Sequence, residues 1–115
     1  MNLESPPKIK ELSAAEVLKA ADLVTYKDGS FVSREIVKKP TGDVTIFAFD
    51  KGQGLSEHTV AVDALVQVLE GEVEISISGK PYRLHEGDMI LMPALQPHAL
   101  KALSRFKMIL TRIQP

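Results

Sequence analysis

Residues 73–92 read VEISISGKPYRLHEGDMILM, and this stretch decides the fold. Val73, Ile75 and Ile77 alternate with polar residues, which is the period-two pattern of a strand that buries one face. Glycine and proline then interrupt the chain at sequences that favour tight turns. The pattern therefore predicts three short strands joined by two turns: strand 73–77, turn 78–81, strand 82–84, turn 85–88 and strand 89–92.

Similar segments lie on both sides of this stretch. Val44–Phe49 is apolar on both faces apart from Thr45, so we expect both faces to be covered. Further strands are expected at 31–38, 65–69, 98–102 and 106–113. Many short strands at even spacing, separated by turns, indicate an all-β antiparallel sandwich or barrel. Closure into a barrel also removes the exposed edges that a strand-rich chain must otherwise protect.

The start of the chain has a different character, because none of the seven glycines precedes Gly29. Ser5-Pro6-Pro7 is expected to be extended, since a residue before proline avoids the helical region. Ser13-Ala14-Ala15-Glu16 has the pattern of a capping box, and apolar residues follow it at helical intervals, which predicts one helix of about ten residues. We therefore expect a leader over residues 1–29 and a β-barrel domain over residues 30–115.

The composition excludes several classes of function. The 115 residues include 14 basic and 15 acidic side chains, so the formal charge is −1 and nothing suggests a nucleic-acid partner. No apolar run approaches the roughly 20 residues of a membrane span, so no membrane partner is expected. Cysteine is absent, which rules out disulfides and thiolate catalysis. The first residues lack the apolar core of a signal peptide, so we expect a cytoplasmic protein.

Two short sequence patterns carry the residues of greatest chemical interest. The first holds Gly52, His58 and Gly71, and the second holds Gly87, Pro93 and His98. Their spacings resemble the two motifs of the cupin superfamily, and only 15 residues separate them, as in small single-domain cupins of the cupin 2 type. The resemblance covers residues 30–113. It implies a double-stranded β-helix, the jelly-roll barrel of the cupins, preceded here by a short N-terminal helix.

The resemblance also implies a metal site, and the chain departs from the family at that site. In metal-binding cupins, two histidines and a glutamate of the first motif join the histidine of the second motif around one ion. This chain keeps His58 and His98 but has Val60 and Ala64 at the other two positions. Two imidazoles make a poor cage for zinc or for iron of the two-His-one-carboxylate type. We therefore expect a degenerate site, at which a divalent Zn, Fe, Mn or Ni ion would be held only weakly by His58 and His98.

Other polar side chains near the motifs are poorly placed to complete such a site. Asp63 precedes the glutamate position by one residue, and a one-residue slip on a strand points a side chain at the opposite face. Glu57, Gln67 and Gln96 would reach the ion only if a loop moved inward. Leu95 and Ala102 replace the glycine and asparagine of the second motif.

The retained histidines suggest a small-molecule site in the barrel. A neutral imidazole can accept or give a proton near neutral pH, and a small barrel holds at most one small ligand. We expect the ligand-binding residues to be His58, His98, Val60, Ala64, Val66 and Met92, with Phe47 or Phe106 as further candidates. The alternative is a metal-dependent oxygenase, isomerase or decarboxylase that uses the two histidines as ligands. A third hypothesis is a barrel packed shut, with a structural or regulatory role, so the sequence leaves open whether the protein is an enzyme.

Other features are interpreted more simply. His85 lies in a turn and is expected to be solvated, and Glu70, Glu72 and Glu74 are interpreted as a solvated strand face. Lys107 is expected to face solvent from a core strand. We also expect a homodimer, because similar cupins commonly pair their sheets and Val44–Phe49 needs cover on both faces.

Overall fold

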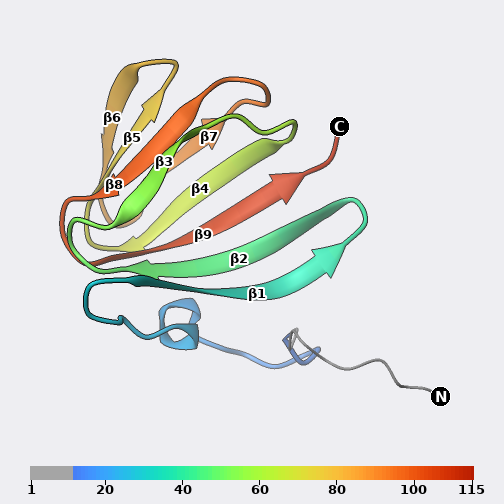
Figure 1. Cartoon of the computed structure of the whole chain (residues 1–115). Coiled ribbons are helices and arrows are strands. Elements are labelled where there is room, and N and C mark those ends of the chain that lie inside the picture. Colours follow the sequence, from blue (N-terminus) through green and yellow to red (C-terminus); the bar gives the residue numbers. More distant parts are fainter. Residues whose placement is uncertain (1–11) are drawn as a thin grey trace.

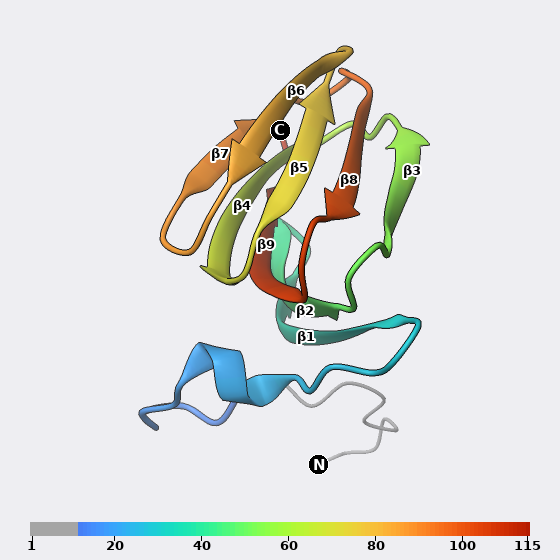
Figure 2. The ribbon, with the colours of Figure 1, turned by 90° about the vertical axis from the view of Figure 1, so that its left-hand side faces the viewer.

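The computed structural model describes residues 12–115, which form two antiparallel sheets that face each other (Figures 1 and 2). One sheet has the strand order β1-β2-β9-β4-β7, and the other has the order β3-β8-β5-β6. The strands are β1 (Phe31–Lys39), β2 (Gly42–Phe49), β3 (Gly54–His58), β4 (Asp63–Glu70), β5 (Val73–Ile77), β6 (Lys80–Leu84), β7 (Met89–Met92), β8 (His98–Ala102) and β9 (Phe106–Ile113). This is the expected all-β architecture. Ser5-Pro6-Pro7, expected to be extended, lies outside the described residues.

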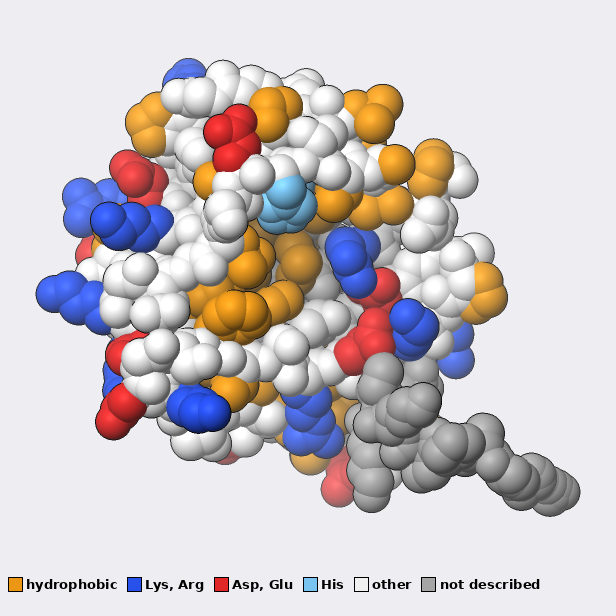
Figure 3. All heavy atoms as spheres, viewed as in Figure 1, with side chains coloured by type: hydrophobic (Ala, Val, Ile, Leu, Met, Phe, Trp, Pro, Cys, Tyr) orange, Lys and Arg blue, Asp and Glu red, His pale blue; other side chains and the backbone are white. Residues whose placement is uncertain are grey.

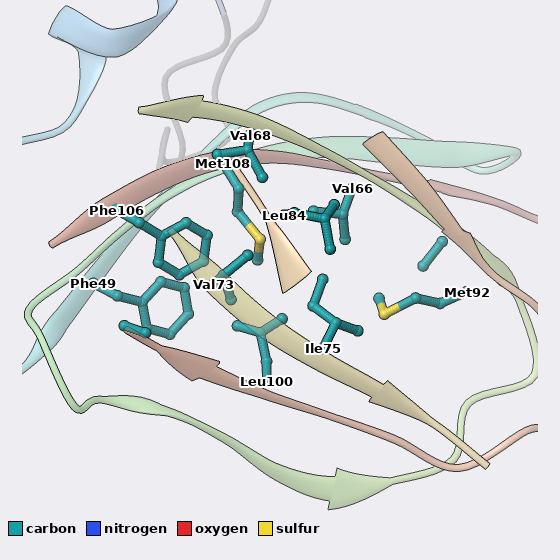
Figure 4. Close-up of a cluster of buried hydrophobic side chains, with 12 residues drawn as sticks. Phe49, Val66, Val68, Val73, Ile75, Leu84, Met92, Leu100, Phe106 and Met108 are labelled. Carbon is teal, nitrogen blue, oxygen red and sulfur yellow. The ribbon is translucent and has the colours of Figure 1, made fainter. Parts of the chain in front are cut away.

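The core fills the space between the two sheets. Because side chains alternate along a strand, every second residue of β4, β5 and β9 points inward. Phe49 on β2 stacks on Phe106 on β9 with ring centroids 5.1 Å apart, and both side chains are fully buried (Figure 4). The other buried members of this cluster are Ala64, Val66, Val68, Val73, Ile75, Leu84, Met92, Leu100, Ala102 and Met108. The barrel is therefore closed at the end of the two phenylalanines.

Gly71 shows why the first motif requires a glycine at its end. This residue turns the chain between β4 and β5 with φ of +82°, a left-handed conformation that other residues adopt at a cost. A Cβ atom there would also collide with the carbonyl oxygen of Arg105 and with Phe106. The turn that closes the barrel against the start of β9 therefore depends on the missing side chain.

The expected ten-residue helix in the leader is wrong. The chain forms only a short 3₁₀ helix, η1 (Ala20–Leu23), and Ala15 has φ of 59°, which ends any helix that the capping box would start. Val17 is 99% exposed, so the apolar side of the expected helix has no surface to pack on there. A helix of about ten residues is stable only when tertiary contacts support it. Without such contacts, the chain runs extended into η1.

The leader covers the outer face of the five-stranded sheet. Val24 packs with Ile36, Ile46 and Ala48, and all four are buried. Figure 2 shows the segment around η1 lying beneath β1 and β2. Residues of the same chain therefore cover both faces of β2, and this strand needs no second subunit for its burial.

Lys107 does not face solvent, contrary to the expectation from the sequence. Its side chain is 11% exposed, and Nζ donates a hydrogen bond to the carbonyl oxygen of Ala21 at 2.6 Å. The Tyr26 hydroxyl donates to Glu70 Oε1 at 2.6 Å, and the same carboxylate lies 3.7 Å from Lys107 Nζ. Alternation correctly places Lys107 opposite Phe106, but the leader covers that outer face. We call Tyr26, Glu70 and Lys107 the leader clasp.

Candidate functional site

His58 and His98 are direct partners on adjacent strands of one sheet. They pair in the register of β3 and β8, and their ring centroids are 4.4 Å apart at 67°. His98 is 5% exposed, whereas His58 lies at the exposed end of β3. No strand was expected at β3, because Gly54–His58 is short and mostly polar. A register shift follows Leu55 in the pairing of β3 with β8. That shift brings the two rings together.

Each ring is oriented by a backbone carbonyl two residues earlier. His58 Nδ1 lies 2.8 Å from the oxygen of Ser56, and His98 Nδ1 lies 3.3 Å from the oxygen of Gln96. A carbonyl oxygen only accepts hydrogen bonds, so Nδ1 carries the proton in both rings and Nε2 has the lone pair in the neutral form. The pKa of His98 is lowered, mainly because burial disfavours the charged ring. The lowered pKa keeps this ring neutral near pH 7.

Both histidines line a cavity of about 50 Å³ at the open end of the barrel. The structure also places Val60, Ala64 and Met92 on its walls, as expected from the sequence. Val66 is instead part of the closed core, and Phe47 and Phe106 are not among the lining residues. Figure 3 shows a histidine side chain at the rim of a hollow with a hydrophobic floor. The sequence did not identify Leu55, Ala99, Leu100, Met108, Leu110 and Arg112 as lining residues.

Arg112 is the charged residue of this cavity wall. It pairs in register with Ala64 on β4 and with Asp43 on β2, so these three side chains lie on the inner face of the sheet. Its Nε donates to Asp43 Oδ1 at 2.9 Å and its Nη2 to Oδ2 at 3.0 Å, and this bond raises the pKa of Arg112. The signal was present in the sequence, because Arg112 continues the inward series of Met108 and Leu110 on β9.

The residues of the cavity do not fit a resident metal ion. Within residues 12–115, no three His, Cys, Asp or Glu side chains come together as a metal-binding group. Asp63 accepts a hydrogen bond from the Ala94 amide at 2.8 Å, and Gln96 accepts one from Ser78 at 3.1 Å. Neither of these side chains lines the cavity, and the same holds for Glu57 and Gln67. The guanidinium of Arg112 also makes the cavity less favourable for a cation.

The third histidine is separate from this site. His85 lies in the turn before β7, where its side chain is 57% exposed. Its Nε2 is 2.8 Å from Glu72 Oε2 and its Nδ1 is 3.5 Å from Asp88 Oδ2. Glu72 is therefore paired, as is Glu70 in the leader clasp, while Glu74 is exposed on β5 as expected. His85 thus provides a matched control for variants of the two cavity histidines.

No helix in residues 12–115 has the length and apolar character needed to cross a bilayer.

A family model described as a cupin domain matches residues 45–112. No curated protein matches the sequence.

Solved structures resemble this chain closely. A conserved protein of unknown function from Streptococcus pyogenes is 37% identical, with a TM-score of 0.87 over 99% of this chain and 98% of that one. A cupin 2 conserved barrel domain protein from Leptotrichia buccalis is 39% identical, with a TM-score of 0.79, over 82% of this chain and 46% of that one. A cupin superfamily protein from Desulfitobacterium hafniense is 25% identical, with a TM-score of 0.86 over 94% and 99% of the two chains.

Proposed function

Because this chain belongs to the cupin family, we propose that its barrel binds a small molecule in the cavity beside His58 and His98. The observation that carries the proposal is the pair of Nε2 lone pairs on a cavity wall that is mostly apolar apart from Arg112. Within residues 12–115, each ring is hydrogen-bonded through Nδ1 and neither Nε2 has a partner. His98 is buried, and an unsatisfied buried acceptor costs free energy, so a ligand that donates a hydrogen bond to its Nε2 gains affinity.

A screen of small polar compounds by NMR on the whole chain tests this function. Ligands of the cavity should shift the amide resonances of Ala64, Ala99 and Leu100, which surround it. His58→Asn and His98→Asn should weaken those ligands about tenfold, because asparagine keeps a donor for the backbone carbonyl but removes the Nε2 acceptor. His85→Asn is the control and should leave binding unchanged. Ligands that shift only resonances outside the cavity would contradict the proposal.

A metal-dependent oxygenase, isomerase or decarboxylase is the second candidate. One observation favours it: both histidines donate Nδ1–H to backbone oxygens, an arrangement common among metal-ligating histidines. This candidate predicts one transition metal per chain in protein purified without chelators, lost in His58→Asn and His98→Asn. Metal-free protein that still binds compounds in the cavity would favour the first candidate.

The proposal includes a homodimer. Met89 and Leu91 are 58% and 53% exposed on β7, which is an edge strand of the five-stranded sheet. An exposed apolar edge strand is a ready surface for pairing with a second copy. Light scattering should give twice the chain mass, and Leu91→Lys should give the monomer. Wild-type monomer at micromolar concentration would contradict the dimer.

Other expectations stay predictions within this proposal. They are the division into a leader, residues 1–29, and a barrel domain, residues 30–115, the cytoplasmic location, and the lack of nucleic-acid partners. The last rests on the nearly balanced charge.

A further inference from the structure

We propose that the ligand of this cavity is a small monocarboxylate held by Arg112. This inference rests on the proposed function, because it names the chemical class of the molecule bound in the same cavity. It starts from a row of side chains across the inner face of the sheet. Asp43, Arg112, Ala64 and Met92 are consecutive partners on β2, β9, β4 and β7.

The hydrogen bonds of Arg112 leave one edge of its guanidinium free. A guanidinium has five N–H groups and can hold one carboxylate along the Nε–Nη2 edge and another along the Nη1–Nη2 edge. Asp43 occupies the Nε–Nη2 edge with bonds of 2.9 and 3.0 Å. Among residues 12–115, no other group accepts a hydrogen bond from Arg112. The second edge is therefore available, and the two bonds to Asp43 hold the plane of the guanidinium in one orientation.

The surroundings of Arg112 favour an anion over a neutral molecule. Among residues 12–115, the cavity wall contains Arg112 but no Asp or Glu side chain, and Asp43 itself does not line the cavity. His98 lies with Nδ1 beside the Gln96 carbonyl, so its Nε2 offers a lone pair to the ligand. Asp43, and Glu35 from farther away, offset part of the charge of Arg112, which suits moderate affinity for a singly charged ligand.

The size of the cavity limits the rest of the ligand. One water needs a cavity of roughly 10–15 Å³, so a cavity of about 50 Å³ admits a molecule with only a handful of non-hydrogen atoms. Leu55, Leu100 and Leu110 would contact its short carbon chain. A hydroxyl on that chain would donate to an Nε2 of the histidine pair. Short carboxylates, and hydroxycarboxylates above all, match this arrangement.

Calorimetric titration with propionate, lactate and propionamide tests the inference in chloride buffer, free of acetate and phosphate. Propionate and propionamide have the same size and differ in charge, and lactate adds one hydroxyl to propionate. We expect propionate to bind at least about tenfold more tightly than propionamide, and lactate more tightly than propionate. Equal binding of propionate and propionamide would overturn the carboxylate assignment and leave the proposed function standing. If none of the probes binds but NMR finds other ligands in the cavity, the inference fails and the function stands. If no compound binds in the cavity, both fail.

Arg112→Gln identifies the residue responsible. Glutamine keeps a donor for Asp43 but has no charge and no second edge. This variant should lose most of the preference for propionate over propionamide while keeping its affinity for propionamide within about twofold. Arg83→Gln, which changes an exposed arginine on β6, is the matched control and should keep the preference. A full preference in Arg112→Gln, in protein with a native NMR spectrum, would overturn the assignment.

Discussion

Ala64 on β4 lies directly opposite Arg112 on β9, so the cavity wall has a methyl group beside a guanidinium. A glutamate at position 64, which the cupin pattern places there, would face that cation. The loss of a metal-ligating carboxylate and the presence of Arg112 therefore belong to one local arrangement.

Restoring the missing ligands should create a metal site. We expect wild-type protein to lose Co²⁺ on desalting, because two imidazoles bind it weakly. Val60→His with Ala64→Glu and Arg112→Met should retain about one Co²⁺ per chain and show its visible absorption bands. The same variant with Arg112 kept should bind less tightly, since the guanidinium competes for the new carboxylate. Ala64→Gln in place of Ala64→Glu is the control. Wild-type protein that retains one metal per chain would show that the chain supplies another ligand.

Acidification should destabilise the fold through His98. Burial lowers the pKa of His98 in the folded chain below its ordinary value of 6.5. As pH falls through 6.5, His98 binds a proton in the unfolded chain but not yet in the folded chain. The free energy of unfolding therefore decreases until the pH is below the pKa of His98 in the folded chain. Urea unfolding between about pH 7.5 and pH 5 should show this loss. This loss should be smaller in His98→Asn than in the wild-type protein. Hydrogen bonds from the Gly29 amide and Arg105 lower the pKa of Asp50 below its ordinary value of 3.8. The stability that this carboxylate contributes is therefore lost only below about pH 3.8, outside the range of this experiment.

Most strands of this fold follow from residue alternation, and the misses have physical causes. Ile75 and Met108 are buried because alternation places them inward, and the same rule would have identified Arg112. Alternation gives the face on which Lys107 lies, but it does not tell what covers that face. The leader covers it, and this contact joins residues far apart in the sequence. The pairing of His58 with His98 depends on a register shift, which leaves no pattern in the residue types.

Replacing Leu95 should stabilise the protein. Leu95 has φ of 68° and is 72% exposed, so its side chain adds strain and little burial. A left-handed conformation costs a residue with a Cβ about 1–2 kcal/mol, and glycine avoids this cost. Glycine also gives the unfolded chain more conformational entropy, which lowers the free energy of unfolding by about 0.4–1 kcal/mol. Leu95→Gly should therefore raise the free energy of unfolding by up to about 1.5 kcal/mol, measured with urea. Gly87→Ala, at φ of +91° in open space, should have the opposite effect. A clear loss of stability in Leu95→Gly would show that this side chain makes a contact the fold needs.

The leader clasp should control how firmly the leader is attached. Tyr26→Phe removes the donor to Glu70 and should cost about 1–2 kcal/mol of unfolding free energy. Lys107→Met leaves the Ala21 carbonyl without its donor. Both variants should speed hydrogen exchange of amides near η1 before they affect the core strands. Lys101→Met, on the exposed side of β8, should not. Unchanged exchange near η1 would contradict this role of the clasp.

β9 has neighbours on both of its faces, since Met108, Leu110 and Arg112 line the cavity while Lys107 holds the leader. β6 is an edge strand with exposed residues at Lys80, Pro81 and Arg83. Few substitutions should be tolerated in β9, because its inward side chains pack in the barrel and its outward Lys107 holds the leader. Drift should accumulate in β6 instead, so a library of random variants selected for folding would keep β9 nearly intact while β6 diversifies.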